Sequence, residues 1–80
     1  MVLFARDRCR LRPLVAAYKE VQTITVRPTG RGPKMDVKGV IMDLPVQVRT
    51  LPSLLDGQDL YVGEGPIMAH LKKCFGATNA

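Results

Sequence analysis

This sequence has few of the side chains that bind metals or cross-link a chain. It contains two cysteines, Cys9 and Cys74, and one histidine, His70. The cysteines form no closely spaced pair, which argues against a disulfide framework and against a cysteine-based zinc site. His70 falls in the middle of an expected helix, where we find no acid or cysteine at ligand spacing. We therefore interpret His70 as a surface or packing residue, expect Cys74 in the core, and expect no metal ion.

Long apolar runs and a secretory leader are also missing. No stretch of about 18 apolar residues could cross a bilayer, and the chain does not begin with the pattern of a signal peptide. We expect a protein without a membrane span in a reducing intracellular compartment, either the cytoplasm or the mitochondrial matrix side. With 80 residues, 46% of them hydrophobic, the chain can enclose one modest core. The sequence therefore predicts a single domain.

Aromatic residues are scarce, and positive charge is concentrated in one half of the chain. Residues 1–40 carry nine Lys and Arg against three acids, whereas residues 41–80 carry three against four. Four arginines alternate within seven residues of the basic half and form a basic patch: Arg6, Arg8, Arg10 and Arg12. This basic patch could hold a phosphate or carboxylate group, or could bind RNA by releasing counterions. None of the aromatic rings alternates with the arginines, as stacking on a single strand requires.

Residues 1–27 predict a β-α-β unit. The apolar run from Val2 to Ala5 is typical of a buried strand. Pro13 suits the first turn of a helix that continues into the apolar residues after it. Residues 23–26 alternate Thr with β-branched apolar residues and favour a second strand. Cys9 would lie at the start of the helix, where the neighbouring arginines favour a thiolate.

Residues 50–76 predict two strands followed by a helix. An apolar run over residues 51–55 stops at Asp56 and Gly57, a dipeptide that closes tight turns, and apolar residues resume at 60–62. Pro66 suits the first turn of the helix, and Gly76 is placed to end it. This part therefore predicts a β-β-α unit, followed by a short tail over residues 77–80.

The connection over residues 28–49 favours no single structure. Glycine and proline over residues 30–33 indicate a loop. Residues 36–44 could form a short helix, although Gly39 and the β-branched Val40 and Ile41 weaken that interpretation. Helix and strand both stay open for this segment.

The segment from Leu51 to Gly76 resembles the N-terminal domain of glutathione S-transferases, in the order of its proline, Asp-Gly turn and acidic helix start. The resemblance implies a thioredoxin-like α/β (α+β) domain with a mixed four-stranded sheet and a cis peptide bond before Pro52. It also implies that the backbone of Leu51 pairs with the cysteine of glutathione, and that Glu64 and Gly65 hold the γ-glutamyl end. Gly65 replaces the family's serine, and the lost hydroxyl should weaken glutathione binding roughly ten- to hundredfold.

The residues around Cys9 are similar to those of glutaredoxins and cysteine-type transferases, whose reactive cysteine begins the first helix. The resemblance implies that Cys9 could form a mixed disulfide with glutathione. Cys9 could equally be a small apolar residue packed beneath the first turn. Arg10 replaces the proline that follows the cysteine in glutaredoxins, and Arg12 replaces the second cysteine of a dithiol site. A mixed disulfide could therefore not be resolved within the chain.

Three functions from different classes follow. The favoured one is a non-catalytic thioredoxin-fold module that docks as a structural subunit into a larger protein assembly and requires no cofactor. Similar lobes are interaction domains in aminoacyl-tRNA synthetases and translation factors, and we expect this one to lack the family's helical C-terminal domain. The second is a monothiol glutathione-dependent oxidoreductase with Cys9 as nucleophile. The third is RNA or ribosome association through the arginine-rich half.

Overall fold

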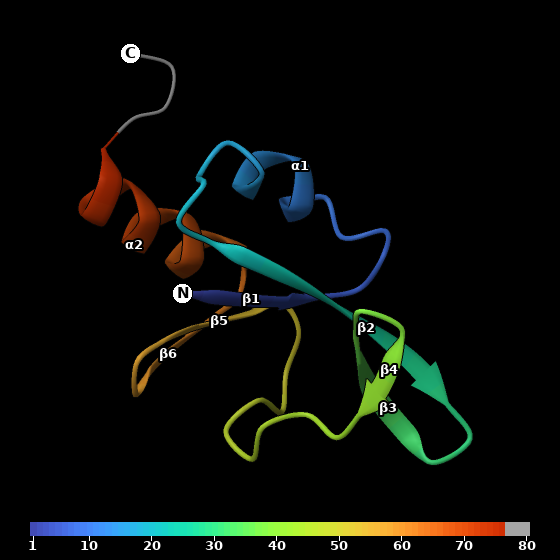
Figure 1. Ribbon diagram of the computed structural model, residues 1–80. Helices are drawn as coiled ribbons and strands as arrows, with labels where there is room; N and C mark the ends of the chain where they lie inside the picture. The colour runs from blue at the N-terminus through green and yellow to red at the C-terminus, as the bar shows by residue number, and fades with distance from the viewer. Residues whose placement is uncertain (77–80) are drawn as a thin grey trace.

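The computed structural model describes residues 1–76 (Figure 1). Two helices and six strands make up this part of the chain. In chain order they are β1 (Val2–Ala5), α1 (Leu11–Val15), β2 (Gln22–Thr29), β3 (Gly32–Val37), β4 (Val40–Met42), β5 (Ser53–Asp56), β6 (Asp59–Val62) and α2 (Glu64–Phe75). The predicted tail over residues 77–80 lies outside the described residues.

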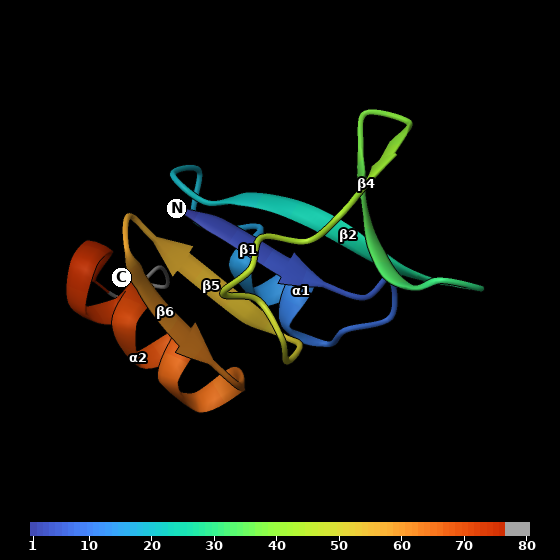
Figure 2. The ribbon, with the colours of Figure 1, turned by 90° about the horizontal axis from the view of Figure 1, so that it is seen from below.

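The strands form one mixed sheet in the order β4-β3-β2-β1-β5-β6 (Figure 2). β1 and β2 are parallel, in a register that pairs Phe4 with Ile24. The other four neighbouring pairs are antiparallel. A parallel pair needs a crossover connection, and α1 lies in the one between β1 and β2. The structure is therefore an α+β domain, as predicted.

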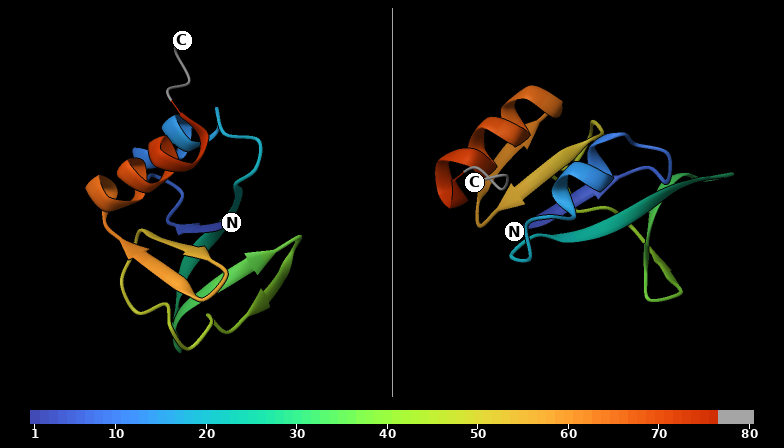
Figure 3. Two further views of the ribbon diagram at one scale, coloured as in Figure 1. Left: turned by 90° about the vertical axis from the view of Figure 1, so that its left-hand side faces the viewer. Right: turned by 90° about the horizontal axis from the view of Figure 1, so that it is seen from above.

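The two faces of the sheet have different covers. Both helices lie on one face, and the segment of residues 43–52 crosses the other (Figures 1 and 3). Because side chains alternate along a strand, β1 contributes to both cores. The core under the helices consists of Leu3, Ala5, Leu11, Val15, Tyr18, Leu54, Ile67 and Leu71. The core under the segment 43–52 consists of Phe4, Val26 and Val48.

The predicted hairpin and C-terminal helix are confirmed. Gly57, with φ of +62°, occupies the turn between β5 and β6. Pro66 lies in the first turn of α2, where its missing N–H leaves no intrahelical bond unmade. Gly76 follows the helix with φ of +76°, and its N–H donates to the Lys72 carbonyl at 2.8 Å. No helix within residues 1–76 is long and apolar enough to cross a membrane.

The prediction of a four-stranded sheet is wrong, because the connection between β2 and β5 adds β3 and β4. Residues 36–44 form no helix. Lys38 and Gly39, at φ of +52° and +88°, close a tight hairpin turn instead. The Asp36 carboxylate accepts the Gly39 N–H at 2.9 Å and supports this turn. Pro33, which belongs to the segment expected to be a loop, lies in β3 and is paired with Pro28 of β2.

The first helix is shorter than its apolar sequence suggested. α1 ends at Val15, and the chain then turns so that the Tyr18 N–H donates to the Val15 carbonyl at 2.9 Å. Tyr18 is buried in the helix-side core, and its hydroxyl donates to the Gly76 carbonyl at 3.4 Å. The turn therefore places Tyr18 against the end of α2 rather than extending α1.

Candidate functional site

A cavity of about 510 Å³ lies where three segments meet at one end of the sheet. The segments are the loop after β1, the start of β3, and the segment of residues 43–52. Backbone and side chains from all three form its walls. The lining residues are Arg6, Arg8, Cys9, Pro33, Leu44, Arg49, Thr50, Leu51 and Pro52.

One wall of the cavity is the turn that leads into β5. The Leu51–Pro52 peptide bond is cis, as the resemblance implies. The Pro52 carbonyl accepts the N–H of Gly63 at 3.0 Å, which ties this wall to the residue before α2. Ser53 is fully buried, and its hydroxyl donates to the Thr50 carbonyl. The wall is therefore fixed from both ends by hydrogen bonds.

Cys9 contributes to the opposite wall, in the loop between β1 and α1. Its N–H donates to the Arg6 carbonyl and its carbonyl accepts the Arg12 N–H, each at 3.1 Å, so its position is set by two turns. The side chain is partly buried, packs against the helix-side core and also lines the cavity. Both interpretations of Cys9 therefore stay open, because the residue packs against the core beneath α1 and also lines a cavity large enough for a ligand.

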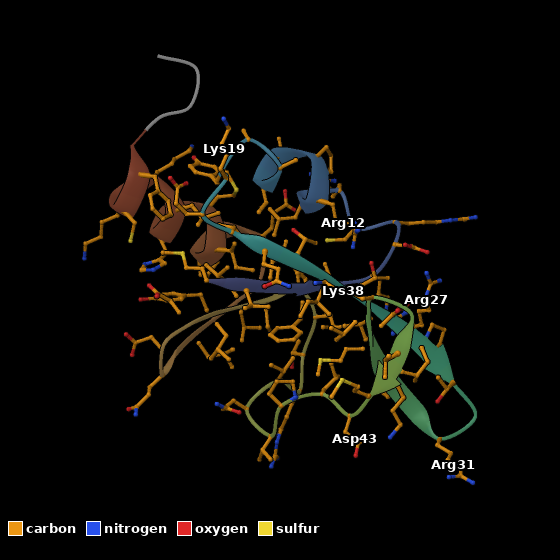
Figure 4. All side chains as sticks on the ribbon, in the orientation of Figure 1. Arg12, Lys19, Arg27, Arg31, Lys38 and Asp43 are labelled. Atoms are coloured by element: carbon orange, nitrogen blue, oxygen red, sulfur yellow. The ribbon has the colours of Figure 1, made fainter. Side chains whose placement is uncertain are left out.

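The alternating arginines point to different places. Arg6 and Arg8 line the cavity. Arg10 lies 3.4 Å from the Glu64 carboxylate, between Nε and Oε2. Arg12, labelled between α1 and β2 in Figure 4, donates to the Thr25 hydroxyl at 3.1 Å. The four side chains therefore form no single patch.

Arg49 joins the cavity from a distant part of the sequence. With Arg6 and Arg8 it gives the lining three arginines, and no acidic residue is among the lining residues. Sequence reasoning missed Arg49, because only the fold brings residues 49–52 next to the loop after β1. The only cue in the sequence was its position just before the Leu51–Pro52 pair. The cavity favours a ligand with negative charge.

Glu64 and Gly65 lie at the start of α2 and do not line the cavity. The contact between Arg10 and Glu64 connects this helix start to the loop that carries Cys9. The fold therefore brings Cys9, Leu51 and Pro52 together, and it places Glu64 and Gly65 at the neighbouring end of α2.

The interpretation of His70 as a histidine without acid or cysteine neighbours is wrong. Its Nε2 lies 2.8 Å from Oδ2 of Asp56, at the end of β5. The Sγ atom of Cys74, one helical turn further along α2, lies 3.5 Å from the same nitrogen. The Cys74 spacing of four residues was visible in the sequence, whereas the Asp56 contact depends on how the β5–β6 hairpin packs against α2. Cys74 is also exposed rather than part of the core.

Comparison with known proteins found no relative of this chain. No family model matches it, and no curated protein or solved structure gives a significant match.

Proposed function

We propose that this chain is a thioredoxin-like lobe that binds glutathione in the Cys9 cavity and exchanges disulfides with it. The observation that carries the proposal is that Cys9 and the Leu51–Pro52 turn line one cavity together with three arginines. The order β1-α1-β2 followed by β5-β6-α2 supports the same assignment, with β3 and β4 as an addition to it.

The cavity suits glutathione in its charge and its exposed backbone. Glutathione carries two carboxylates, which the side chains of Arg6, Arg8 and Arg49 can neutralise. Leu51 belongs to no strand pairing, and its N–H and carbonyl make no hydrogen bond within the described part of the chain. They are therefore available to pair with the cysteine backbone of a bound peptide-like thiol.

The reaction that this arrangement supports is thiol–disulfide exchange. The Cys9 thiolate attacks one sulfur of oxidised glutathione, a bond forms between Cys9 Sγ and that sulfur, and the other glutathione leaves as a thiolate that takes a proton from water. Reduced glutathione then attacks the glutathione sulfur of the mixed disulfide, which releases the Cys9 thiolate and re-forms oxidised glutathione, so the two steps exchange the disulfide without net oxidation or reduction. Cys74 does not line the cavity, so the chain itself offers no resolving thiol there.

Incubation with oxidised glutathione tests this proposal, with mass spectrometry of each cysteine over time. We expect Cys9 to acquire glutathione faster than Cys74, although Cys74 is the more exposed thiol. Cys74→Ser should keep the fast reaction and Cys9→Ser should lose it. Arg49→Ala should slow the reaction about fivefold, because a pair of unit charges about 4 Å apart is worth ~1 kcal/mol in water.

Arg31→Ala provides the matched control, since Arg31 lies in the turn between β2 and β3 (Figure 4) and does not line the Cys9 cavity. It should leave the rate of Cys9 modification unchanged. Equal rates for the two cysteines, or a rate indifferent to Arg49, would refute a glutathione site in this cavity.

A second candidate function, docking into a protein assembly, rests on the outer edge of the sheet. β4 is an edge strand, and all three of its apolar residues are exposed: Val40 by 58%, Ile41 by 52% and Met42 by 46%. An unpaired apolar edge can accept a strand from a partner protein. RNA binding gains no comparable support, because Arg10 and Arg12 contact groups within the chain.

Sedimentation at increasing protein concentration tests the docking edge, because a second copy can pair with β4 in place of a partner. We expect concentration-dependent association that Ile41→Lys strongly reduces, since a lysine on an edge strand disfavours pairing with another strand. Val46→Lys is the control, because Val46 is 83% exposed and lies outside the strands. A monomer at every concentration, with or without the substitution, would argue against this candidate.

A further inference from the structure

A cluster of three side chains lies on the hairpin side of α2, with no assigned role in the Cys9 cavity. Asp56 comes from the end of β5, and His70 and Cys74 come from successive turns of α2. One potential ligand atom from each lies within 4.8 Å of the other two. The fold alone produces this cluster, because Asp56 is 14 residues from His70 in the sequence.

The distances in the cluster are close to those around a tetrahedral zinc ion. Bond lengths of ~2.0–2.2 Å to nitrogen or oxygen and ~2.3 Å to sulfur separate the nitrogen and sulfur ligands by about 3.6 Å, and nitrogen and oxygen by about 3.4 Å. Here His70 Nε2 lies 3.5 Å from Cys74 Sγ and 2.8 Å from Asp56 Oδ2. A separation larger by about 0.6 Å would bring the Asp56 oxygen and His70 Nε2 to the tetrahedral value, and the ligand atoms of Asp56 and Cys74 lie within 4.8 Å of each other.

The same distances disfavour a proton relay between a catalytic cysteine and an Asp-His pair. In such a relay the acid and the nucleophile contact opposite nitrogens of the imidazole. Here Asp56 and Cys74 both approach Nε2, and Cys74 Sγ lies further from Nδ1, at 3.9 Å. Two ligand atoms that both lie nearest to Nε2 fit a shared cation better than a chain of proton transfers that uses both nitrogens.

The surroundings of His70 hold the ring in place and leave negative charge at the cluster. The Tyr61 ring stacks on the imidazole, with centroids 3.9 Å apart and an angle of 16° between planes. Within residues 1–76, the Asp56 carboxylate contacts His70 at 2.8 Å and forms no ion pair with a lysine or arginine.

We propose that Asp56, His70 and Cys74 form a three-ligand zinc site whose fourth position is open to solvent. The three donors are a carboxylate oxygen, an imidazole nitrogen and a thiolate, all of which zinc accepts. The Cys74 thiol loses its proton when the metal binds. The exposure of Cys74 gives the metal a route of entry.

Zinc titration of the purified chain, with a chromophoric chelator as competitor, tests the site. We expect one equivalent of Zn²⁺ to bind, and we expect His70→Gln, Asp56→Asn and Cys74→Ser each to weaken binding by at least about tenfold. Titration with Co²⁺ should give the charge-transfer absorption of a cobalt thiolate, and Cys74→Ser should abolish it. Because the chain has one histidine, NMR of its imidazole reports directly whether Nε2 carries the metal.

Two substitutions serve as matched controls. Asp59→Asn removes the carboxylate of Asp59, the residue opposite Asp56 in the ladder between β5 and β6. Cys9→Ser removes the other thiol. Both should bind zinc as the unmodified chain does, so the test is independent of the glutathione proposal. Circular dichroism checks that every variant is folded. Unchanged zinc affinity in folded Cys74→Ser or His70→Gln, or a cobalt spectrum without a thiolate band, would overturn the zinc site.

Discussion

Leu54→Ala is expected to lower the free energy of unfolding by about 2–5 kcal/mol, the usual cost of removing a buried leucine side chain. Leu54 is fully buried in β5, where it faces the helix-side core and is paired with Leu3 and Tyr61 on the two neighbouring strands. The surrounding strands and α2 cannot easily close the cavity that the substitution leaves. Urea denaturation followed by circular dichroism measures the change, which should also lower Tm by roughly 10–30 °C.

The control for this prediction is Leu14→Ala, which removes the same atoms from a residue that is 49% exposed on α1. It should change stability by less than about 0.5 kcal/mol. Equal losses for the two leucines would mean that the core beneath α2 is looser than the burial of Leu54 implies.

Gly63→Ala is expected to cost about 1–3 kcal/mol, because Gly63 has a backbone conformation that is nearly restricted to glycine. Its φ is +92° and its ψ is 158°, at the position just before α2. A new Cβ would lie 3.8 Å from Pro66, so the cost arises from the backbone and not from a collision. The same residue donates to the Pro52 carbonyl and accepts the N–H of Ile67. Strain here would loosen both the start of α2 and the wall of the Cys9 cavity.

Gly65→Ala, two residues further on, is the matched control with the opposite sign. Gly65 lies inside α2 and has open space where a Cβ would be added. Alanine there should stabilise the chain by up to about 1 kcal/mol, because it reduces the freedom of the unfolded state. Thermal unfolding of the two variants side by side checks the prediction. A Gly63→Ala variant as stable as the unmodified chain would contradict it.

Local patterns in the sequence predicted much of the fold. The Asp56–Gly57 turn, the strands on both sides of it and the end of α2 at Gly76 follow from residue type and spacing, and all are present. The strands β3 and β4 were left undecided because proline and glycine interrupt their pattern. In the structure, Pro28 and Pro33 face each other in the ladder between β2 and β3. This pairing forms only when the two strands come together, so the local sequence pattern does not reveal it.

The candidate sites were predictable only in part, for a related reason. Cys9, Leu51 and Pro52 were named from the sequence by resemblance, and they share a cavity. Arg49 and the partners of His70 were missed. The fold brings Arg49 to the loop after β1, and the packing of α2 on the β5–β6 hairpin brings Asp56 to His70. The contact between His70 and Cys74 could have been predicted, because residues four apart on a helix are neighbours.

The unequal covering of the two sheet faces also has a dynamic consequence. Two helices hold one face through eight buried side chains, whereas the other is covered by residues 43–52, a segment without helix or strand that buries Val48 beside Phe4 and Val26. Local opening costs least where few buried contacts hold a segment. That segment supplies Leu44 and Arg49 to the Cys9 cavity ahead of the turn that hydrogen bonds hold at Thr50 and Pro52, so the cavity can widen on the side of Leu44 while that turn and the helix-side half of the protein keep their shape.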